Sequence, residues 1–212
     1  MTHGDLLEPA LDAPAGRPED RQTVIESAVD EFRAHAFHQV SLQTIAQRAG
    51  LPVERVQAHF ATFDDLVQAV VHVWYSERMA PIMPIADQFG AVRFLRAIVV
   101  ANLADPGLMR LLSALVNVCA TEDHPMAPVL QQQWMRFHAL VQRALARDVE
   151  LGREPDTMDP ARGAEQLIAL YEGLQLQSMV RPAMNLLGAY DRAVTRLRDG
   201  WSQSYTPPIW EI

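Results

Sequence analysis

The sequence contains no lysine, a single cysteine and no long apolar run. All 18 basic residues are arginine and face 26 acidic residues, so the formal net charge is −8. The bias towards arginine fits either a GC-rich genome, which we favour, or a protein that needs planar hydrogen-bond donors. Because Cys119 stands alone, the chain holds no intrachain disulfide, and a reducing compartment is favoured.

Membrane and secretion signals are also lacking. No apolar run approaches the roughly 18 residues that cross a bilayer. The start of the sequence is acidic and proline-bearing, unlike the basic and then apolar start of a signal peptide. We therefore expect a cytoplasmic protein that does not contact a membrane.

Length and composition are those of a globular protein with a sizeable core. With 212 residues, of which 49% are apolar, the chain can form one or two domains, and disorder of the whole chain is excluded. Residues 1–80 carry 6 arginines against 12 acidic residues, whereas residues 81–212 carry 12 against 14. The N-terminal part is therefore the more acidic one.

Every strong hydrophobic pattern is helical, and no alternating run typical of a strand is present. The sequence predicts an all-α protein with nine helices. They cover residues 21–36, 41–50, 53–60, 62–80, 88–104, 107–120, 127–151, 160–180 and 188–201.

Local signals set several of these boundaries. The pairs Thr23–Glu26 and Thr62–Asp65 have the spacing of a capping box, in which two side chains satisfy backbone N–H groups at a helix start. Gly50 can take the positive φ of a tight turn. Pro81 and Pro84 are expected to end the fourth helix, because proline lacks the N–H that a helix interior uses.

The first four helices resemble a helix-turn-helix unit, whose second short helix enters the major groove of DNA. Ile45-Ala46, Ala49-Gly50 and His59-Phe60 resemble the N-terminal signature of TetR-family transcriptional regulators. The stretch EGLQLQSMVRP at 172–182 resembles a segment that recurs in the eighth helix of that family. The chain length and the nine helices extend the resemblance over nearly the whole sequence.

Residues 1–18 hold prolines and glycines and show little periodicity, so we expect a mobile N-terminal arm there. The resemblance implies a DNA-binding domain at 19–66 and a ligand-binding and dimerisation domain at 67–212. It also implies a homodimer whose interface is a four-helix bundle of the helices 160–180 and 188–201. Gly173 permits a close approach of two helices there. The residues expected to supply the apolar interface are Leu167, Leu170, Leu174, Ala193, Val194, Leu197 and Trp201.

The predicted DNA-binding domain departs from the family pattern. The family commonly has hydroxyl-bearing residues or lysine at the start of the recognition helix, a tyrosine before the His-Phe pair and a lysine after it. Here these positions hold Pro52-Val53-Glu54, Gln57 and Phe63. Because phosphate contacts supply most non-specific affinity, we expect weakened DNA binding. The candidate contacts are Gln43, Arg48, Val53, Arg55, Gln57 and His59, and a solvated face is the alternative.

Apolar stripes in the C-terminal part carry a few polar residues. Phe94, Ile98 and Asn102 form one stripe, and the helix at 127–151 forms another. A mostly apolar cavity with a few hydrogen-bonding groups is what a small-molecule site needs, although a packed core gives the same pattern. The candidate ligand-binding residues are Phe94, Ile98, Asn117, Trp134, His138, Tyr171 and Gln175.

The leading hypothesis is a transcriptional repressor that binds operator DNA as a dimer and is released by a small, mostly apolar ligand. One alternative is a TetR-like scaffold that has lost DNA binding and serves as a ligand-binding protein or an enzyme, with His138 or Tyr171 as proton-transfer groups. Another binds DNA only with a partner. The sequence holds no catalytic motif, so we assign no catalytic residue, metal or cofactor. His35 and His38 have a spacing that suits a metal, but no third ligand follows.

Overall fold

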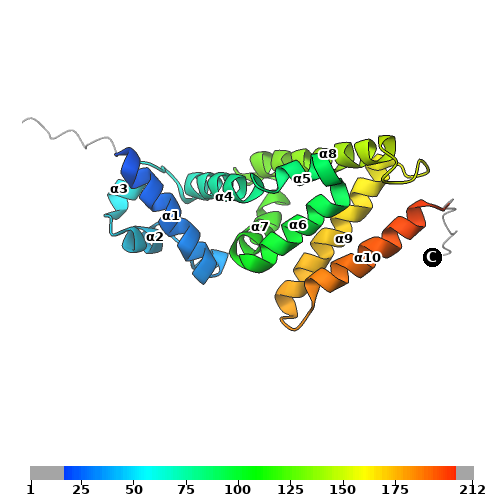
Figure 1. The fold of residues 1–212 in the computed structure, drawn as a ribbon. Helices are drawn as coiled ribbons and strands as arrows, with labels where there is room; N and C mark the ends of the chain where they lie inside the picture. Colours follow the sequence, from blue (N-terminus) through cyan, green and yellow to red (C-terminus); the bar gives the residue numbers. More distant parts are fainter. Residues whose placement is uncertain (1–16, 204–212) are drawn as a thin grey trace, which may run out of the picture.

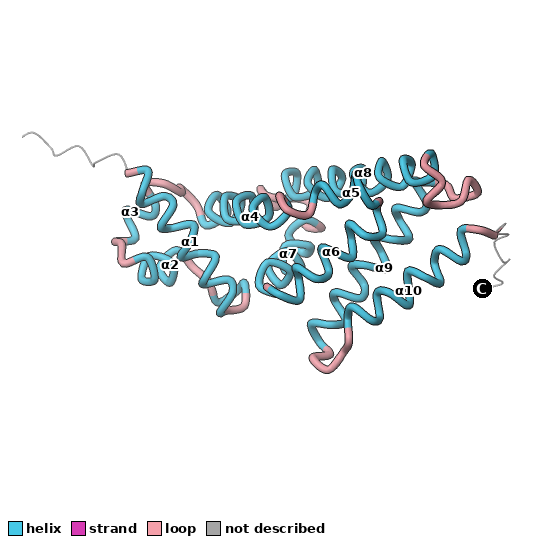
Figure 2. Tube along the Cα trace, in the orientation of Figure 1, coloured by secondary structure: helices cyan, strands magenta, loops and turns pink. Residues whose placement is uncertain are grey.

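The computed structural model describes residues 17–203, which form an elongated arrangement of helices (Figures 1 and 2). No strand occurs in this part of the chain, so the prediction of an all-α fold is confirmed. The predicted arm at 1–18 lies almost entirely outside the described residues. The helices are α1 (Pro18–Ala34), the 3-10 helix η1 (Phe37–Gln39), α2 (Leu42–Ala49), α3 (Val53–Gln57), α4 (Phe63–Met79), α5 (Met83–Phe89), α6 (Ala91–Ala104), α7 (Pro106–Cys119), α8 (Ala127–Glu150), α9 (Pro160–Val180) and α10 (Leu186–Trp201).

The prediction of nine helices missed α5. Helix α4 ends at Met79, but Pro84 lies in the first turn of α5 instead of terminating a helix. Proline is tolerated there because the first N–H groups of a helix have no partner within it. Gly90, at φ +87°, then separates α5 from α6.

The capping signals were partly correct. Thr62 and Asp65 form the predicted capping box, and Gly50 takes a left-handed conformation at φ +65°. The predicted box at Thr23–Glu26 is wrong because α1 begins earlier, at Pro18, with no side-chain cap. The Thr23 hydroxyl instead donates to the carbonyl of Glu19 inside the helix.

Two apolar clusters share α4. The first joins α1 to α4 with the inner face of α7 and the start of α8. The second joins α5, α6, α8, α9 and α10. The α4 residues from Leu66 to Trp74 belong to the first cluster, whereas Met79 belongs to the second. The expected domain boundary at residue 66 therefore falls inside α4, which contributes residues to both clusters. Figure 1 shows α4 leading from α1–α3 towards the rest of the molecule.

The chain bends sharply between α6 and α7, at Asp105. No single helix in residues 17–203 combines the length and apolar composition of a membrane span, and α6 with α7 meets that test only as a pair bent by 107°. The Asp105 carboxylate caps α7 by accepting a hydrogen bond from the Gly107 N–H at 3.2 Å. This bend brings the start of α7 against the end of α1.

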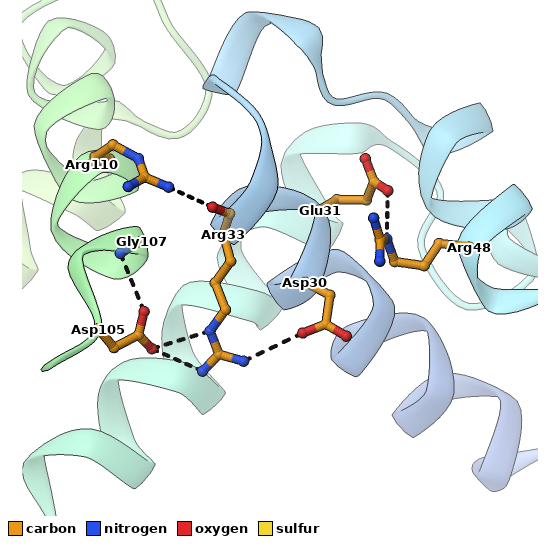
Figure 3. A network of polar contacts seen from close by, with 7 residues as sticks. All are labelled: Asp30, Glu31, Arg33, Arg48, Asp105, Gly107 and Arg110. Carbon is orange, nitrogen blue, oxygen red and sulfur yellow. Dashed lines mark hydrogen bonds and ion pairs between the residues drawn. The ribbon is translucent and has the colours of Figure 1, made fainter.

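Arg33 near the end of α1 makes the contacts across this junction (Figure 3). Its Nε and NH2 groups donate to one Asp105 oxygen at 3.1 and 2.8 Å. Arg110 of α7 donates in return to the Arg33 carbonyl. The helices can approach this closely because Gly107 has no side chain: a Cβ there would lie 2.9 Å from the Arg33 Cγ and 3.0 Å from a Trp74 ring carbon.

Gly107→Ala is therefore expected to lower the free energy of unfolding by about 1–3 kcal/mol, the usual cost of overpacking. Trp74 is only 4% exposed, so it has little room to move aside. The matched control is Gly200→Ala, because a Cβ at that helical glycine would meet nothing within 4 Å. Urea denaturation followed by circular dichroism measures both variants. Equal stability of the two would contradict the close approach at Gly107.

Candidate functional site

Helices α2 and α3 form the helix-turn-helix unit, and they place the six candidate DNA contacts differently. Gln43 on α2 and Gln57 at the end of α3 are exposed, whereas Val53 is half-buried at the start of α3. His59 follows α3, which is shorter than predicted, and its Nε2 is buried without a hydrogen-bond partner. Of these four residues, the two glutamines are therefore the exposed ones.

The two candidate arginines have acidic partners on α1. The Arg48 Nε donates to a carboxylate oxygen of Glu31, which is buried. A guanidinium nitrogen of Arg55 lies 3.4 Å from an Asp20 oxygen. These partners are 17 and 35 positions away in the sequence, so no local pattern indicated them.

The other two arginines between residues 21 and 66 are also engaged within the chain. The Arg21 guanidinium lies over the Phe60 ring, 5.2 Å from its centroid. Arg33 pairs with Asp105 at the α1–α7 junction. All four arginines in this segment therefore contact other parts of the protein, and a phosphate would have to compete with those contacts.

A cavity of about 360 Å³ lies where the two apolar clusters meet. This volume suits a small molecule, since ligand pockets range from roughly 300 to 1,000 Å³. Helices α4 to α9 form its wall. Of these, α5 and α9 contribute one residue each, Met83 and Tyr171. The lining residues are Val71, His72, Tyr75, Arg78, Met79, Met83, Ile98, Asn102, Leu108, Met109, Leu112, Leu115, Leu130, Gln133, Trp134, Arg136, Phe137, Leu140 and Tyr171.

Three of the seven candidate ligand-binding residues line this cavity: Ile98, Trp134 and Tyr171. They come from α6, α8 and α9, so the fold brings together residues that are far apart in the sequence. Their grouping agrees with the expected site, but whether they contact a ligand remains a prediction.

The other four candidates lie elsewhere, which corrects the expected grouping. Phe94 is fully buried in the second apolar cluster, and Asn117 is exposed on the outer face of α7. His138 is half-buried on α8 and is not one of the lining residues. Gln175 is buried on α9, one turn beyond Tyr171, and its Nε2 has no partner. Periodicity assigned these residues to apolar faces, but it could not separate packed parts of a face from the part that lines a void.

Arg78 and Asn102 are two polar wall residues that the candidate set omitted, and His72, Gln133 and Arg136 are three more. Arg78 follows Val71, Trp74 and Tyr75 at helical spacing, so a charged residue interrupting the apolar stripe of α4 was an available signal. Asn102 lay on the recognised stripe of α6 and is buried. Both now belong to the cavity wall.

A chain of hydrogen bonds runs along the cavity wall to the α6–α7 bend. The Asn102 amide donates to the Tyr171 hydroxyl at 3.0 Å, which in turn donates to the Met109 sulfur at 3.8 Å. One Arg78 nitrogen donates to the Asn102 side-chain oxygen, and another donates to the Asp105 carbonyl at 2.9 Å. Asp105, which pairs with Arg33 of α1, thus also contacts the cavity wall through Arg78.

Burial perturbs the ionisable groups of this wall. It raises the pKa of Tyr171 well above its ordinary value despite the hydrogen bond from Asn102, so the hydroxyl stays neutral near pH 7. Burial also raises the pKa of Tyr75 and lowers the pKa of Arg78, which nevertheless stays charged. Tyr171 is therefore a hydrogen-bonding group rather than a base, and His138 is not placed to share a proton with it in the cavity.

These features define a helical protein with an N-terminal helix-turn-helix unit and a partly open cavity. Residues 91–198, about half of the chain, match the family of BetI-type transcriptional repressors in their C-terminal region. The chain belongs to the TetR family of transcriptional regulators. It is 27% identical over 186 residues to the HTH-type transcriptional regulator TtgR of Pseudomonas putida. The matched region covers 83% of this chain and 88% of TtgR.

Solved structures share the fold. SmeT of Stenotrophomonas maltophilia, in complex with triclosan, superposes with a TM-score of 0.67 at 22% identity, over 91% of this chain and 100% of SmeT. A TetR transcription regulator from Haloarcula marismortui gives a TM-score of 0.68 at 16% identity, over 87% of this chain and 98% of that one. At these identities, the likeness establishes the architecture.

The Arg33–Asp105 pair gives a pH-dependent contribution to stability. Burial raises the pKa of Asp105, but the hydrogen bond and charge of Arg33 outweigh burial and hold the pKa below its ordinary value. A depressed pKa in the folded chain means that the pair stabilises the fold above the ordinary pKa of aspartate, and this stabilisation disappears as the pH falls through the folded value.

Asp105→Asn should therefore lower stability at pH 7 by about 0.5–1 kcal/mol, the range for a partly exposed pair. The amide oxygen of Asn still caps α7, so the variant isolates the ion pair. The deficit relative to wild type should shrink below pH 4 in thermal melts. Asp30→Asn is the control, because Asp30 is exposed and lies 3.4 Å from Arg33. A deficit that is the same at pH 7 and pH 3 would contradict the ionic origin.

Proposed function

We propose that the protein is a ligand-responsive repressor, which binds operator DNA as a homodimer and releases it when a small, mostly apolar molecule occupies the cavity. The observation that carries the proposal is the shared helix α4, because it belongs to the apolar cluster of the helix-turn-helix unit and to the cavity wall. A ligand that favours one position of α4 would therefore bias the position of the recognition helix. The triclosan complex of SmeT, a protein of the same fold, is consistent with a ligand in such a cavity.

The proposed dimer uses α9 and α10, which lie side by side at the end of the molecule far from α1–α3 (Figure 1). Several residues expected at the interface belong instead to the chain's own core: Leu167, Val194 and Trp201 are all buried. The exposed stripe on α9 consists of Ala169, Gly173, Leu176 and Val180. The small residues Ala169 and Gly173 suit the close approach of a second α9.

DNA binding in this proposal is weak at physiological salt. Arg48 and Arg55 are tied to acidic residues of α1, so each phosphate contact must replace an internal ion pair. The same observation favours the alternative function, a TetR-like scaffold that uses its cavity without binding DNA. Salt-dependent binding to a duplex decides between the two.

The DNA prediction concerns Arg55 and its partner Asp20. Arg55→Ala should weaken binding to every duplex and reduce the salt slope by about 0.9 per subunit for each phosphate that is no longer neutralised. Asp20→Asn should tighten binding, because it frees the Arg55 guanidinium. Fluorescence anisotropy with the duplex upstream of the gene, from 50 to about 200 mM salt, measures both effects.

Glu26→Gln is the matched control for Asp20→Asn. It removes one negative charge from the same helix, but Glu26 accepts a hydrogen bond from Gln22 rather than from an arginine. Equal tightening by both variants would show that net charge alone matters. Absence of binding for the wild type even at low salt would favour the scaffold without DNA binding.

The dimer prediction rests on the exposed apolar side chains of α9. Val180→Arg should convert the dimer to a monomer, because Val180 is 75% exposed in the isolated chain and a buried, unpaired guanidinium is costly. Met135→Arg is the control, because Met135 on α8 is 64% exposed and lies outside the proposed interface. Light scattering should give twice the chain mass of 23.7 kDa for wild type and control. A wild-type monomer at micromolar concentration would refute the dimer.

A further inference from the structure

The cavity carries positive charge in a protein of net charge −8. Two arginines and a histidine, Arg78, Arg136 and His72, belong to its wall. Among the described residues, no aspartate or glutamate lines it. The charge of the cavity wall is therefore opposite in sign to the net charge of the protein. The overall composition does not explain this difference.

Arg78 is the more enclosed of the two arginines. Its side chain is half-buried, whereas Arg136 is exposed. Burial disfavours its charge, which is why its pKa is lowered, and a guanidinium so placed normally pairs with a carboxylate. Within residues 17–203, however, Arg78 forms no ion pair.

The nearby carboxylate is committed elsewhere. One Asp105 side-chain oxygen accepts from Arg33 and the other from the Gly107 N–H, so the Asp105 charge favours the charged form of Arg78 without a direct ion pair. Among the described residues, Arg78 donates hydrogen bonds only to neutral oxygens, the Asp105 carbonyl and the Asn102 amide oxygen. A guanidinium has five N–H donors, so donors remain for a further acceptor.

The rest of the wall offers apolar and aromatic surface. Trp134 and Phe137 of α8 and Tyr75 of α4 line the cavity together with Ile98. Flat rings supply contact area at little entropic cost, but they give no partner to a charge. A ligand that satisfies the whole wall therefore combines an apolar, ring-sized body with one negative group.

We propose that the cavity binds an apolar organic anion, an aromatic carboxylate in its simplest form, whose acidic group pairs with Arg78. This inference rests on the proposed function of the cavity as a ligand site and names its ligand class. The anion supplies the charge partner that Arg78 lacks. It accepts from the Arg78 N–H groups that do not donate to Asn102 or to the Asp105 carbonyl, beside the bend that contacts α1.

Isothermal titration of the full chain with two probes tests the proposal. The probes are 2-naphthoate and 2-naphthalenemethanol, which share a ring system and differ in charge. Wild type should bind 2-naphthoate about tenfold or more tightly than the alcohol, with one molecule per chain, because a charge-assisted hydrogen bond in an enclosed site favours the anion. Arg78→Gln should remove this preference, and Arg78→Lys should keep part of it.

Arg136→Gln is the matched control, since it removes a second arginine of the same wall and should keep the preference within about threefold. The wild-type comparison of the two probes needs no variant, so it stands even if Arg78→Gln does not fold. Equal affinity for acid and alcohol would overturn the anion inference while leaving a ligand cavity. Loss of the preference in Arg136→Gln alone would overturn the role of Arg78. Failure of both probes to bind would overturn the ligand cavity itself.

Discussion

Asp105 is the residue on which the arrangement of the two ends of the molecule depends. Its carboxylate caps α7 and accepts the Arg33 guanidinium of α1, while its carbonyl accepts a hydrogen bond from Arg78 of α4. Three helices are therefore tied at one turn of the chain. Because Gly107 follows two residues later without a side chain, α1 can lie directly against this turn. The helix-turn-helix unit is thus held by the same short segment that borders the cavity.

The ion pairs explain how a chain with few cations distributes its charge. Arg48 and Arg55 of the helix-turn-helix unit pair with acidic residues of α1, and Arg21 lies over the Phe60 ring. Arg78 lines the cavity and forms no ion pair within the described residues. In a family of DNA-binding proteins, the opposite distribution would be expected, with free cations on the recognition surface. Positive charge is therefore more restrained on the helix-turn-helix unit than at the cavity wall.

The helices could be predicted from sequence because their signals are local. Caps, glycines at positive φ and apolar periodicity act within one or two turns, and Thr62 and Gly50 behaved accordingly. The prediction at Pro84 was wrong because proline occurs both after the end of a helix and in its first turn, so the local signal does not distinguish the two. The family resemblance, which rested on the Ile45-Ala46 and His59-Phe60 motifs, was correct.

The candidate site was harder to predict because it is made by packing between distant elements. Phe94, Ile98 and Asn102 lie on one stripe of α6, yet Phe94 is in the core and the other two line the cavity. Eight residues of helix span about 12 Å, so one face can begin in a packed core and end at a void. The acidic partners of Arg48 and Arg55 could not be predicted either, because they lie 17 and 35 positions away and produce no periodic pattern in the sequence.

The division of apolar contacts around α4 also bears on how the chain folds during synthesis. The cluster that supports the helix-turn-helix unit includes Leu108, Leu111 and Leu115 of α7, as well as Met126 and Leu130. These residues are synthesised after α1–α4. The apolar cluster of the N-terminal helices is therefore incomplete until they are present. A nascent or prematurely ended chain lacking residues beyond about 130 would leave this core open. Helix α3 thus acquires a fixed position only once much of the cavity wall has been made, so an incomplete chain would lack a rigid helix-turn-helix unit.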